Sequence, residues 1–165
     1  MPILEENTFE YFSRSADQTR RFGMRLGALL KCNQLVCLSG DLGSGKTTLV
    51  QGLAQGWGST DPVTSPTFVL VNEYGRPDGE ILFHLDAYRL NNACEAEELD
   101  LEEMLLRGSL VVEWPEKIQS ALPSNSLHIA MHWMADEQRG LVVSARGKEY
   151  QEMLTDIRRQ VYGGY

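Results

Sequence analysis

The sequence lacks the features that mark membrane, secreted and metal-stapled proteins. No apolar run reaches the ~18 residues that a membrane helix needs, and the first ten residues carry acids where a signal peptide carries bases. The three cysteines, Cys32, Cys37 and Cys94, form no C-x-x-C pair and show no zinc-ligand spacing, which indicates free thiols. We therefore expect a soluble protein of the cytoplasm with no membrane partner.

Positive charge is also scarce. Fifteen Lys and Arg face twenty-three Asp and Glu, so the net charge is −8. Such a chain repels a phosphate backbone, and direct nucleic-acid binding is disfavoured. The acids are densest at residues 95–103, a pattern typical of a solvated helix surface, with a docking face as the alternative.

The 165 residues contain no repeat, linker or low-complexity stretch, which predicts one domain over residues 1–165. Ser15 and Gln18 form a capping box that predicts a helix start, and the turn composition of residues 76–79 predicts a β-hairpin. Hydrophobic periodicity predicts strands at 7–12, 34–39, 67–74, 80–86, 110–112, 126–133 and 141–144, and helices after Ser15, at 48–57 and around 150–161. We expect an α/β domain whose mixed sheet has a mainly parallel core, flanked by helices and carrying the hairpin as an insertion.

One glycine-rich segment has a specific motif. Residues 40–47, Gly-Asp-Leu-Gly-Ser-Gly-Lys-Thr, match G-x-x-x-x-G-K-[ST], follow a predicted strand and open a predicted helix. Glycines let the backbone bring its N–H groups against phosphate oxygens, Lys46 can reach the β- and γ-phosphates, and the Thr47 hydroxyl can ligate Mg²⁺. The segment predicts the phosphate-binding loop of a P-loop NTPase.

Two acids follow predicted buried strands, where ligands collect in open α/β sheets. Asp86 ends the run Ile-Leu-Phe-His-Leu-Asp, and Glu113 ends Leu-Val-Val-Glu. One can serve a metal while the other holds the attacking water, and spacing alone leaves the two roles open.

Other candidates have weaker signals. Thr67, in Thr-Ser-Pro-Thr, lies where nucleotide switches keep a γ-phosphate-sensing threonine, although Ser-Pro is also an ordinary turn. Trp114 follows Glu113 and lies either near a nucleotide or in the core. His128 and His132 are spaced for one face of a strand and, without a third ligand, are interpreted as structural.

Four blocks together resemble the bacterial TsaE (YjeE) family of ATPases. They are GDLGSGKTT at 40–48, SPTF at 65–68, HLDAYRL at 84–90 and VEWP at 112–115, in matching order and spacing across roughly residues 15–144. The resemblance implies an Mg²⁺-dependent ATPase, with ATP and Mg²⁺ as cofactors, that is needed to make threonylcarbamoyladenosine at position 37 of tRNA. It implies docking on the transferase TsaD and its partner TsaB, with tRNA held only through that complex.

The resemblance also assigns roles to individual residues. It gives Lys46 and the backbone of residues 43–48 to the phosphates, Thr47 and Glu113 to Mg²⁺, and Asp86 to the γ-phosphate. Thr67 becomes a switch residue and Trp114 an aromatic beside the site. The implied nucleotide contacts are Asp41, Gly43, Ser44, Gly45, Lys46, Thr47, Thr48, Thr19, Arg139 and Trp114.

Three other classes of protein are alternatives to this interpretation. A small-molecule P-loop kinase would need an arginine-rich lid, but Arg139 stands alone between Glu137 and Gly140. A GTP-binding switch would need a guanine-reading N-K-x-D motif, which the chain lacks. A docking module that binds nucleotide without hydrolysing it stays open.

Overall fold

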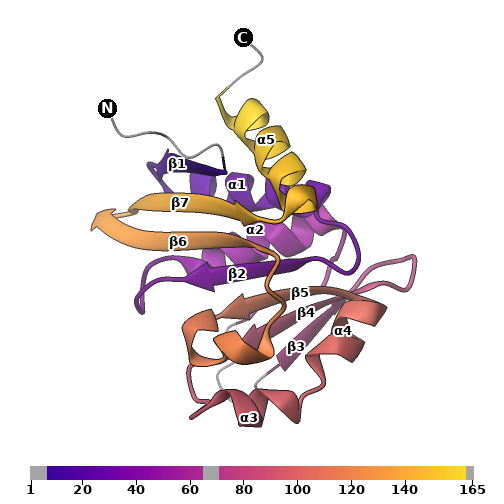
Figure 1. The fold of residues 1–165 in the computed structure, drawn as a ribbon. Helices are drawn as coiled ribbons and strands as arrows, with labels where there is room; N and C mark the ends of the chain where they lie inside the picture. The colour runs from indigo at the N-terminus through magenta and orange to yellow at the C-terminus, as the bar shows by residue number, and fades with distance from the viewer. Residues whose placement is uncertain (1–6, 65–70, 163–165) are drawn as a thin grey trace.

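The computed structural model describes residues 7–64 and 71–162, and there the chain forms one seven-stranded mixed sheet (Figure 1). The spatial order of the strands is β1-β7-β6-β2-β5-β4-β3. Their bounds are β1 Thr8–Ser13, β2 Leu35–Ser39, β3 Val71–Gly75, β4 Ile81–Asp86, β5 Gly108–Glu113, β6 Ser126–Ala135 and β7 Gln138–Arg146.

The four central strands are parallel, and the edges are antiparallel. β6, β2, β5 and β4 run the same way, while β3 pairs antiparallel with β4, and β7 and β1 complete the other edge. β2 and β5 read as continuous apolar runs because both of their faces are buried. The expected mixed sheet with a parallel core is confirmed.

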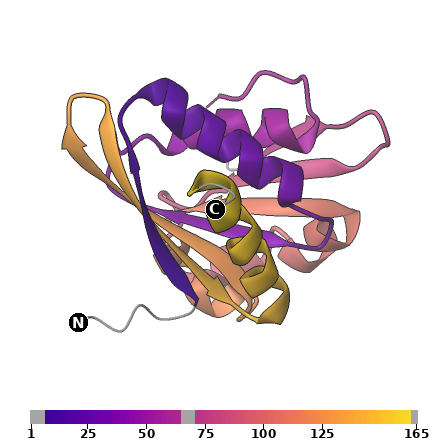
Figure 2. The same cartoon turned by 90° about the horizontal axis from the view of Figure 1, so that it is seen from above.

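Helices cover both faces of the sheet. α1, α2 and α5 pack on one face, and α3 and α4 cover part of the other (Figures 1 and 2). The helix bounds are α1 Ala16–Leu29, α2 Lys46–Trp57, α3 Ala93–Glu97, α4 Leu101–Arg107 and α5 Lys148–Val161, with 3₁₀ turns η1 Pro115–Lys117 and η2 Gln119–Ala121. No helix in residues 7–64 or 71–162 has the length and apolar character that crossing a membrane requires.

Close backbone contact fixes α2 against α1. A Cβ on Gly52 would lie 1.9 Å from the Arg20 carbonyl oxygen, and one on Gly23 would lie 2.3 Å from the Leu49 carbonyl oxygen. Only glycine allows this approach at both positions, so the two helices pack as one rigid unit. The N-terminus of α2 is thereby held at one end of the sheet.

Most expected elements are present with shifted ends. Ser15 caps α1 by accepting from the Gln18 N–H at 3.1 Å, which confirms the predicted helix start. The Gln18 side chain accepts from the N–H of Arg14 at 2.8 Å, one residue before the position that a capping box uses. The hairpin is confirmed as β3 and β4, although residues 67–70 of its expected first strand lie outside the described residues. α2 begins at Lys46 rather than at Thr48.

The acidic stretch at residues 95–103 differs most from expectation. It is divided between α3 and α4, and Asp100 between them has φ 54° and caps α4 through the Glu103 N–H. Leu101 is buried in the second apolar core, beneath exposed acids. An acid-rich surface is present, but two short helices carry it.

Candidate functional site

The glycine-rich loop, residues 40–45, joins the carboxyl end of β2 to α2. Gly40, Gly43 and Gly45 have φ of 143°, 80° and 99°, conformations that side chains disfavour. A Cβ on Gly40 would also lie 2.4 Å from the Met131 carbonyl oxygen. The loop therefore delivers the free N–H groups at the start of α2 to the carboxyl edge of the sheet, an arrangement suited to an anion.

Lys46 lies at the start of α2 and is 6% exposed. Its Nζ donates to the carbonyl oxygens of Gly40 and, at 3.2 Å, Asp41, and lies 4.5 Å from the centre of the Trp114 ring. Burial lowers the pKa of Lys46, while the carboxyls of Glu113 and then Asp86 oppose that shift. The ammonium group is thus held between the loop and two acids.

The two acids are neighbours because β4 and β5 are parallel and in register. Asp86 pairs with Glu113 across the strands, so both side chains share one face at the carboxyl edge. Asp86 is half-buried, and its Oδ1 accepts from the Tyr88 N–H at 2.9 Å. Burial raises the pKa of Asp86, and the neighbouring Glu113 carboxyl raises it further.

Glu113 is buried and hydrogen-bonded to a histidine. It is 4% exposed, and its Oε2 lies 2.6 Å from Nε2 of His84, which is fully buried in β4. Nδ1 of His84 lies 2.9 Å from the hydroxyl of Tyr74 in β3. Burial raises the pKa of Tyr74, so the phenol keeps its proton. A three-residue chain thus crosses β3, β4 and β5.

Trp114 follows Glu113 in a left-handed conformation with φ 58°. This backbone conformation costs a bulky residue about 1–3 kcal/mol, so tertiary contacts must hold it. The Trp114 N–H donates to the Leu38 carbonyl at 3.1 Å, and its ring packs 5.0 Å from the ring of Tyr88. The half-buried indole thus lies beside Lys46 and also packs against the second apolar core.

A small cavity of about 80 Å³ lies beside Gly45 of the loop, next to the beginning of α1. Its lining includes Thr19, Gly45, Thr48 and Arg139, four of the residues predicted to contact nucleotide, together with Ala16 and Glu137. Thr19 is buried and its hydroxyl lies 2.6 Å from the Ser13 hydroxyl, which ties α1 to the end of β1. Arg139 donates to the carbonyl oxygens of Gly43, Asp136 and Gln138.

Two polar atoms near Gly45 are buried without a hydrogen-bond partner among the described residues: Ser44 Oγ and Arg139 Nε. Both can donate, and a Cβ on Gly45 would lie 3.5 Å from Arg139 Nε. Because buried donors are normally paired, these two indicate an acceptor that residues 7–64 and 71–162 do not supply. A phosphate group fits this requirement.

The residues also fit a magnesium ion bound together with phosphate. Within residues 7–64 and 71–162, no three His, Cys, Asp or Glu side chains converge on a common point as metal ligands. Mg²⁺ is commonly held by one or two protein oxygens, with phosphates and water as its other ligands. The half-buried Thr47 hydroxyl and the Glu113 carboxyl could supply the protein oxygens.

The structure brings most of the predicted site residues to one edge of the sheet. Thr67 lies outside the described residues, and Asp41 contacts Lys46 through its carbonyl oxygen. Three neighbours were not predicted: His84, Tyr74 and Glu137. A histidine inside the apolar run of β4 was the available signal for His84, whereas Tyr74 is brought close by the pairing of β3 with β4. Glu137 lies in the turn between β6 and β7, two residues before Arg139.

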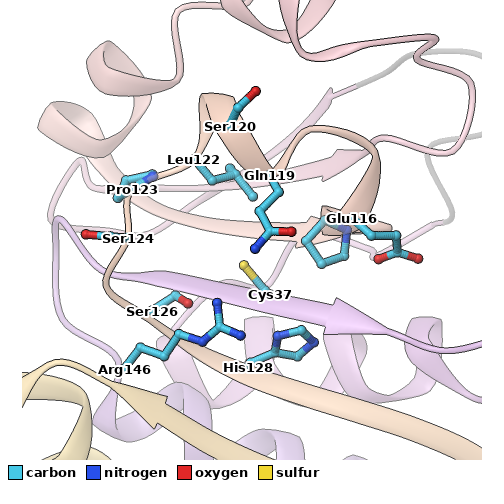
Figure 3. A pocket seen from close by; sticks show the side chains of 11 residues that line it. Cys37, Glu116, Gln119, Ser120, Leu122, Pro123, Ser124, Ser126, His128 and Arg146 are labelled. Atoms are coloured by element: carbon cyan, nitrogen blue, oxygen red, sulfur yellow. The ribbon is translucent and has the colours of Figure 1, made fainter.

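A separate cavity of about 440 Å³ lies on the opposite face of the sheet and contains none of the predicted site residues (Figure 3). It is lined by Cys37 of β2, by His128 and Arg146 of β6 and β7, and by the segment around Gln119. Burial raises the pKa of Cys37 to about 11, so this thiol is a poor nucleophile. His128 is tied to the Ser39 hydroxyl at 2.9 Å.

Together, the fold and the edge site define an α/β protein with a mixed seven-stranded sheet and a glycine-rich loop that leads from β2 into Lys46 at the start of α2. The family model described as "Threonylcarbamoyl adenosine biosynthesis protein TsaE" matches residues 13–141. The chain belongs to the TsaE family.

Relatives and a solved structure agree with this assignment. A protein from Streptomyces coelicolor named tRNA threonylcarbamoyladenosine biosynthesis protein TsaE is 42% identical over 137 residues, covering 79% of this chain and 93% of the relative. A protein of the same name from Bacillus subtilis is 35% identical over 145 residues, covering 87% and 89%. The crystal structure of Bacillus subtilis YdiB is 28% identical, with a TM-score of 0.77 over 93% of this chain and 95% of that one.

Proposed function

We propose that this chain is an Mg²⁺-dependent P-loop ATPase that works in tRNA threonylcarbamoyladenosine biosynthesis. The pathway comes from the family and from the names of its relatives. The chemistry is supported chiefly by one observation, the gathering of Lys46, Asp86 and Glu113 around the loop at one sheet edge. Ser44 Oγ and Arg139 Nε, which are buried and find no partner in the described part of the chain, add support for a bound phosphate.

The chain's own groups divide the work of phosphoryl transfer to water. The ammonium of Lys46 and the N–H groups at the start of α2 bind the phosphate oxygens. Thr47 and Glu113 would hold Mg²⁺, which neutralises charge on the phosphates when bound. Asp86 holds the attacking water, and its raised pKa makes the carboxylate a better proton acceptor than an ordinary aspartate.

Isolated turnover should be slow. An arginine that stabilises the transferring phosphoryl group can contribute about 10³–10⁵ in rate. Arg139 contacts the loop, but its two terminal nitrogens are engaged by the carbonyl oxygens of Asp136, Gln138 and Gly43. We propose that TsaD and TsaB, the partners suggested by the family, complete the site and that hydrolysis at this chain resets their complex. The tRNA would be held by the partners, in keeping with the net charge of −8.

A steady-state assay tests both parts of the proposal. Phosphate release from ATP is measured for the chain alone and with TsaD and TsaB, each with and without Mg²⁺. We expect slow Mg²⁺-dependent release that the partners accelerate. Equal rates with and without partners would contradict the completion of the site, and no phosphate release under any condition would contradict the ATPase itself.

A further inference from the structure

His84 is a fully buried histidine in the middle of an apolar strand. Its neighbours in β4, Phe83 and Leu85, point into the apolar core on the α3 side of the sheet, whereas His84 faces the α1 and α2 side. A buried imidazole is destabilising unless both ring nitrogens find partners. Both do, because Nε2 meets Glu113 and Nδ1 meets Tyr74.

Strand register explains how the three side chains meet. His84 pairs with Val111, two residues before Glu113 in β5, and with Asn72, two residues before Tyr74 in β3. Diagonal positions two residues apart on one face lie about 7–8 Å apart at the Cα atoms, a gap that long side chains span. The chain Tyr74–His84–Glu113 is therefore a consequence of the pairing and runs obliquely toward the carboxyl edge.

The partners also fix the direction of the hydrogen bonds. A carboxylate accepts, so Nε2 of His84 carries the hydrogen and donates to Glu113 Oε2 at 2.6 Å. In a neutral imidazole, Nδ1 is then the acceptor and takes the hydroxyl hydrogen of Tyr74 at 2.9 Å. The Tyr74 oxygen lies 3.4 Å from the Thr64 carbonyl oxygen, at the beginning of the segment that contains Thr67.

We infer that His84 is the positioning residue for the Mg²⁺ ligand Glu113 and that Tyr74 fixes the imidazole for this role. The inference rests on the proposed function, since it takes Glu113 as a ligand of the Mg²⁺ that accompanies ATP. Holding Oε2 fixes the rotamer of the carboxyl group and leaves Oε1 for the metal. Loss of a residue that hydrogen-bonds to a metal ligand commonly lowers the metal affinity about 10–100-fold.

Asp86 provides an internal contrast. It lies beside Glu113 on the same face, but its carboxyl accepts a backbone N–H from Tyr88 and makes no hydrogen bond to a histidine within the described residues. A local turn of this kind needs no third strand. The hydrogen bonds that link Tyr74, His84 and Glu113 thus hold one carboxylate of the pair, the one assigned to the metal.

Three variants separate positioning from simple filling of space. His84→Leu keeps the volume and removes both hydrogen bonds. His84→Gln keeps an N–H donor at the distance of Nε2, and Tyr74→Phe removes only the hydroxyl. His128→Leu is the matched control, because it deletes a histidine that is hydrogen-bonded to Ser39 on the opposite face.

The measurement is calorimetric binding of the β,γ-imido analogue of ATP, in EDTA and over a range of Mg²⁺ concentrations. For His84→Leu we expect unchanged affinity in EDTA and a rise of about 10–100-fold in the Mg²⁺ concentration needed for half-maximal enhancement. His84→Gln should recover most of that loss, Tyr74→Phe should lie between the two, and His128→Leu should match the wild type.

Several outcomes would overturn the inference. It fails if His84→Leu keeps the wild-type Mg²⁺ dependence, if His84→Gln is as impaired as His84→Leu, or if binding weakens equally in EDTA and Mg²⁺. Nitrogen-15 NMR of the wild-type chain without nucleotide gives a second readout, in which a hydrogen on Nδ1 but not on Nε2 would also overturn it. By contrast, a wild-type chain whose nucleotide binding ignores Mg²⁺ would contradict the proposed function itself.

Discussion

The ends of β4 and β5 carry the same chemical group in two different settings. Glu113 is buried and hydrogen-bonded to His84, whereas Asp86 is half-buried and held by a backbone N–H of its own turn. Both carboxyl groups raise the pKa of Lys46, and Glu113 raises it more than Asp86 does. The comparison teaches that two acids in register at neighbouring strand ends can be held differently. Under the proposed function, the buried Glu113 suits a metal and the half-buried Asp86 suits a water.

The largest expected effect separates the two acids by catalysis. Glu113→Gln and Asp86→Asn should each lower the rate of ATP hydrolysis by roughly 10²–10⁴, because each removes a charged group used in the transition state. Raising the Mg²⁺ concentration should partly restore Glu113→Gln and leave Asp86→Asn unchanged. Phosphate release over a Mg²⁺ series measures this, with Glu149→Gln at the exposed start of α5 as control. An identical Mg²⁺ response in both variants would contradict the division of roles.

Lys46→Met removes the cation that both acids face. The loss of its charged hydrogen bonds to phosphate should weaken ATP binding by about 10–100-fold, with or without Mg²⁺, since such bonds contribute about 1.5–3 kcal/mol. Titration calorimetry in EDTA and in Mg²⁺ checks this expectation. Lys148→Met, at the exposed start of α5, should bind like the wild type. Unchanged ATP affinity in Lys46→Met would contradict the assignment of the loop to phosphate binding.

The stability of the chain should separate the acids in a different way. Glu113→Ala leaves Nε2 of the buried His84 without an acceptor, so the free energy of unfolding should fall by about 1–3 kcal/mol. Asp86→Ala removes only a local turn contact and should change it by less than about 0.5 kcal/mol. Urea unfolding at neutral pH without nucleotide measures both. Equal losses of unfolding free energy in the two variants would show that the buried hydrogen bond of Glu113 to His84 contributes no more to stability than the turn contact of Asp86.

The smallest expected effect concerns pH. Because burial raises the pKa of Asp86 above 3.8, the native state binds this proton more tightly than the unfolded chain does. The stabilising contribution of Asp86 is therefore complete below pH 3.8 and is lost as the pH rises through the native-state pKa. Relative to Asp86→Asn, the wild type should become less stable over that window, by a small amount because solvent screens this half-buried group.

Urea midpoints of the wild type and Asp86→Asn, compared at matched pH values from acid to neutral, test this last expectation. The difference between the two proteins should grow with pH and then stay constant. A difference that shrinks as the pH rises would mean that Asp86 is stabilised as the anion, contrary to the direction given above.

Several features were predictable from the sequence because their physics is local. Ser15 and Gln18 lie within one helical turn, so this helix cap needs no tertiary contact. The glycine-rich loop is fixed by residues 40–47 alone, and the apolar runs of β2 and β5 reveal strands buried on both faces. The acidic stretch was harder, since burial of Leu101 and the left-handed Asp100 divide it into two helices.

The sequence by itself determined the loop, the parallel core of the sheet and two acids at strand ends. Only the tertiary structure decided that Asp86 and Glu113 are in register on one face, and that His84 joins Glu113 to Tyr74. Strand register depends on pairing between segments far apart in the chain, and periodicity within one strand cannot reveal its partner. The difference between the two carboxylates is therefore a property of the fold.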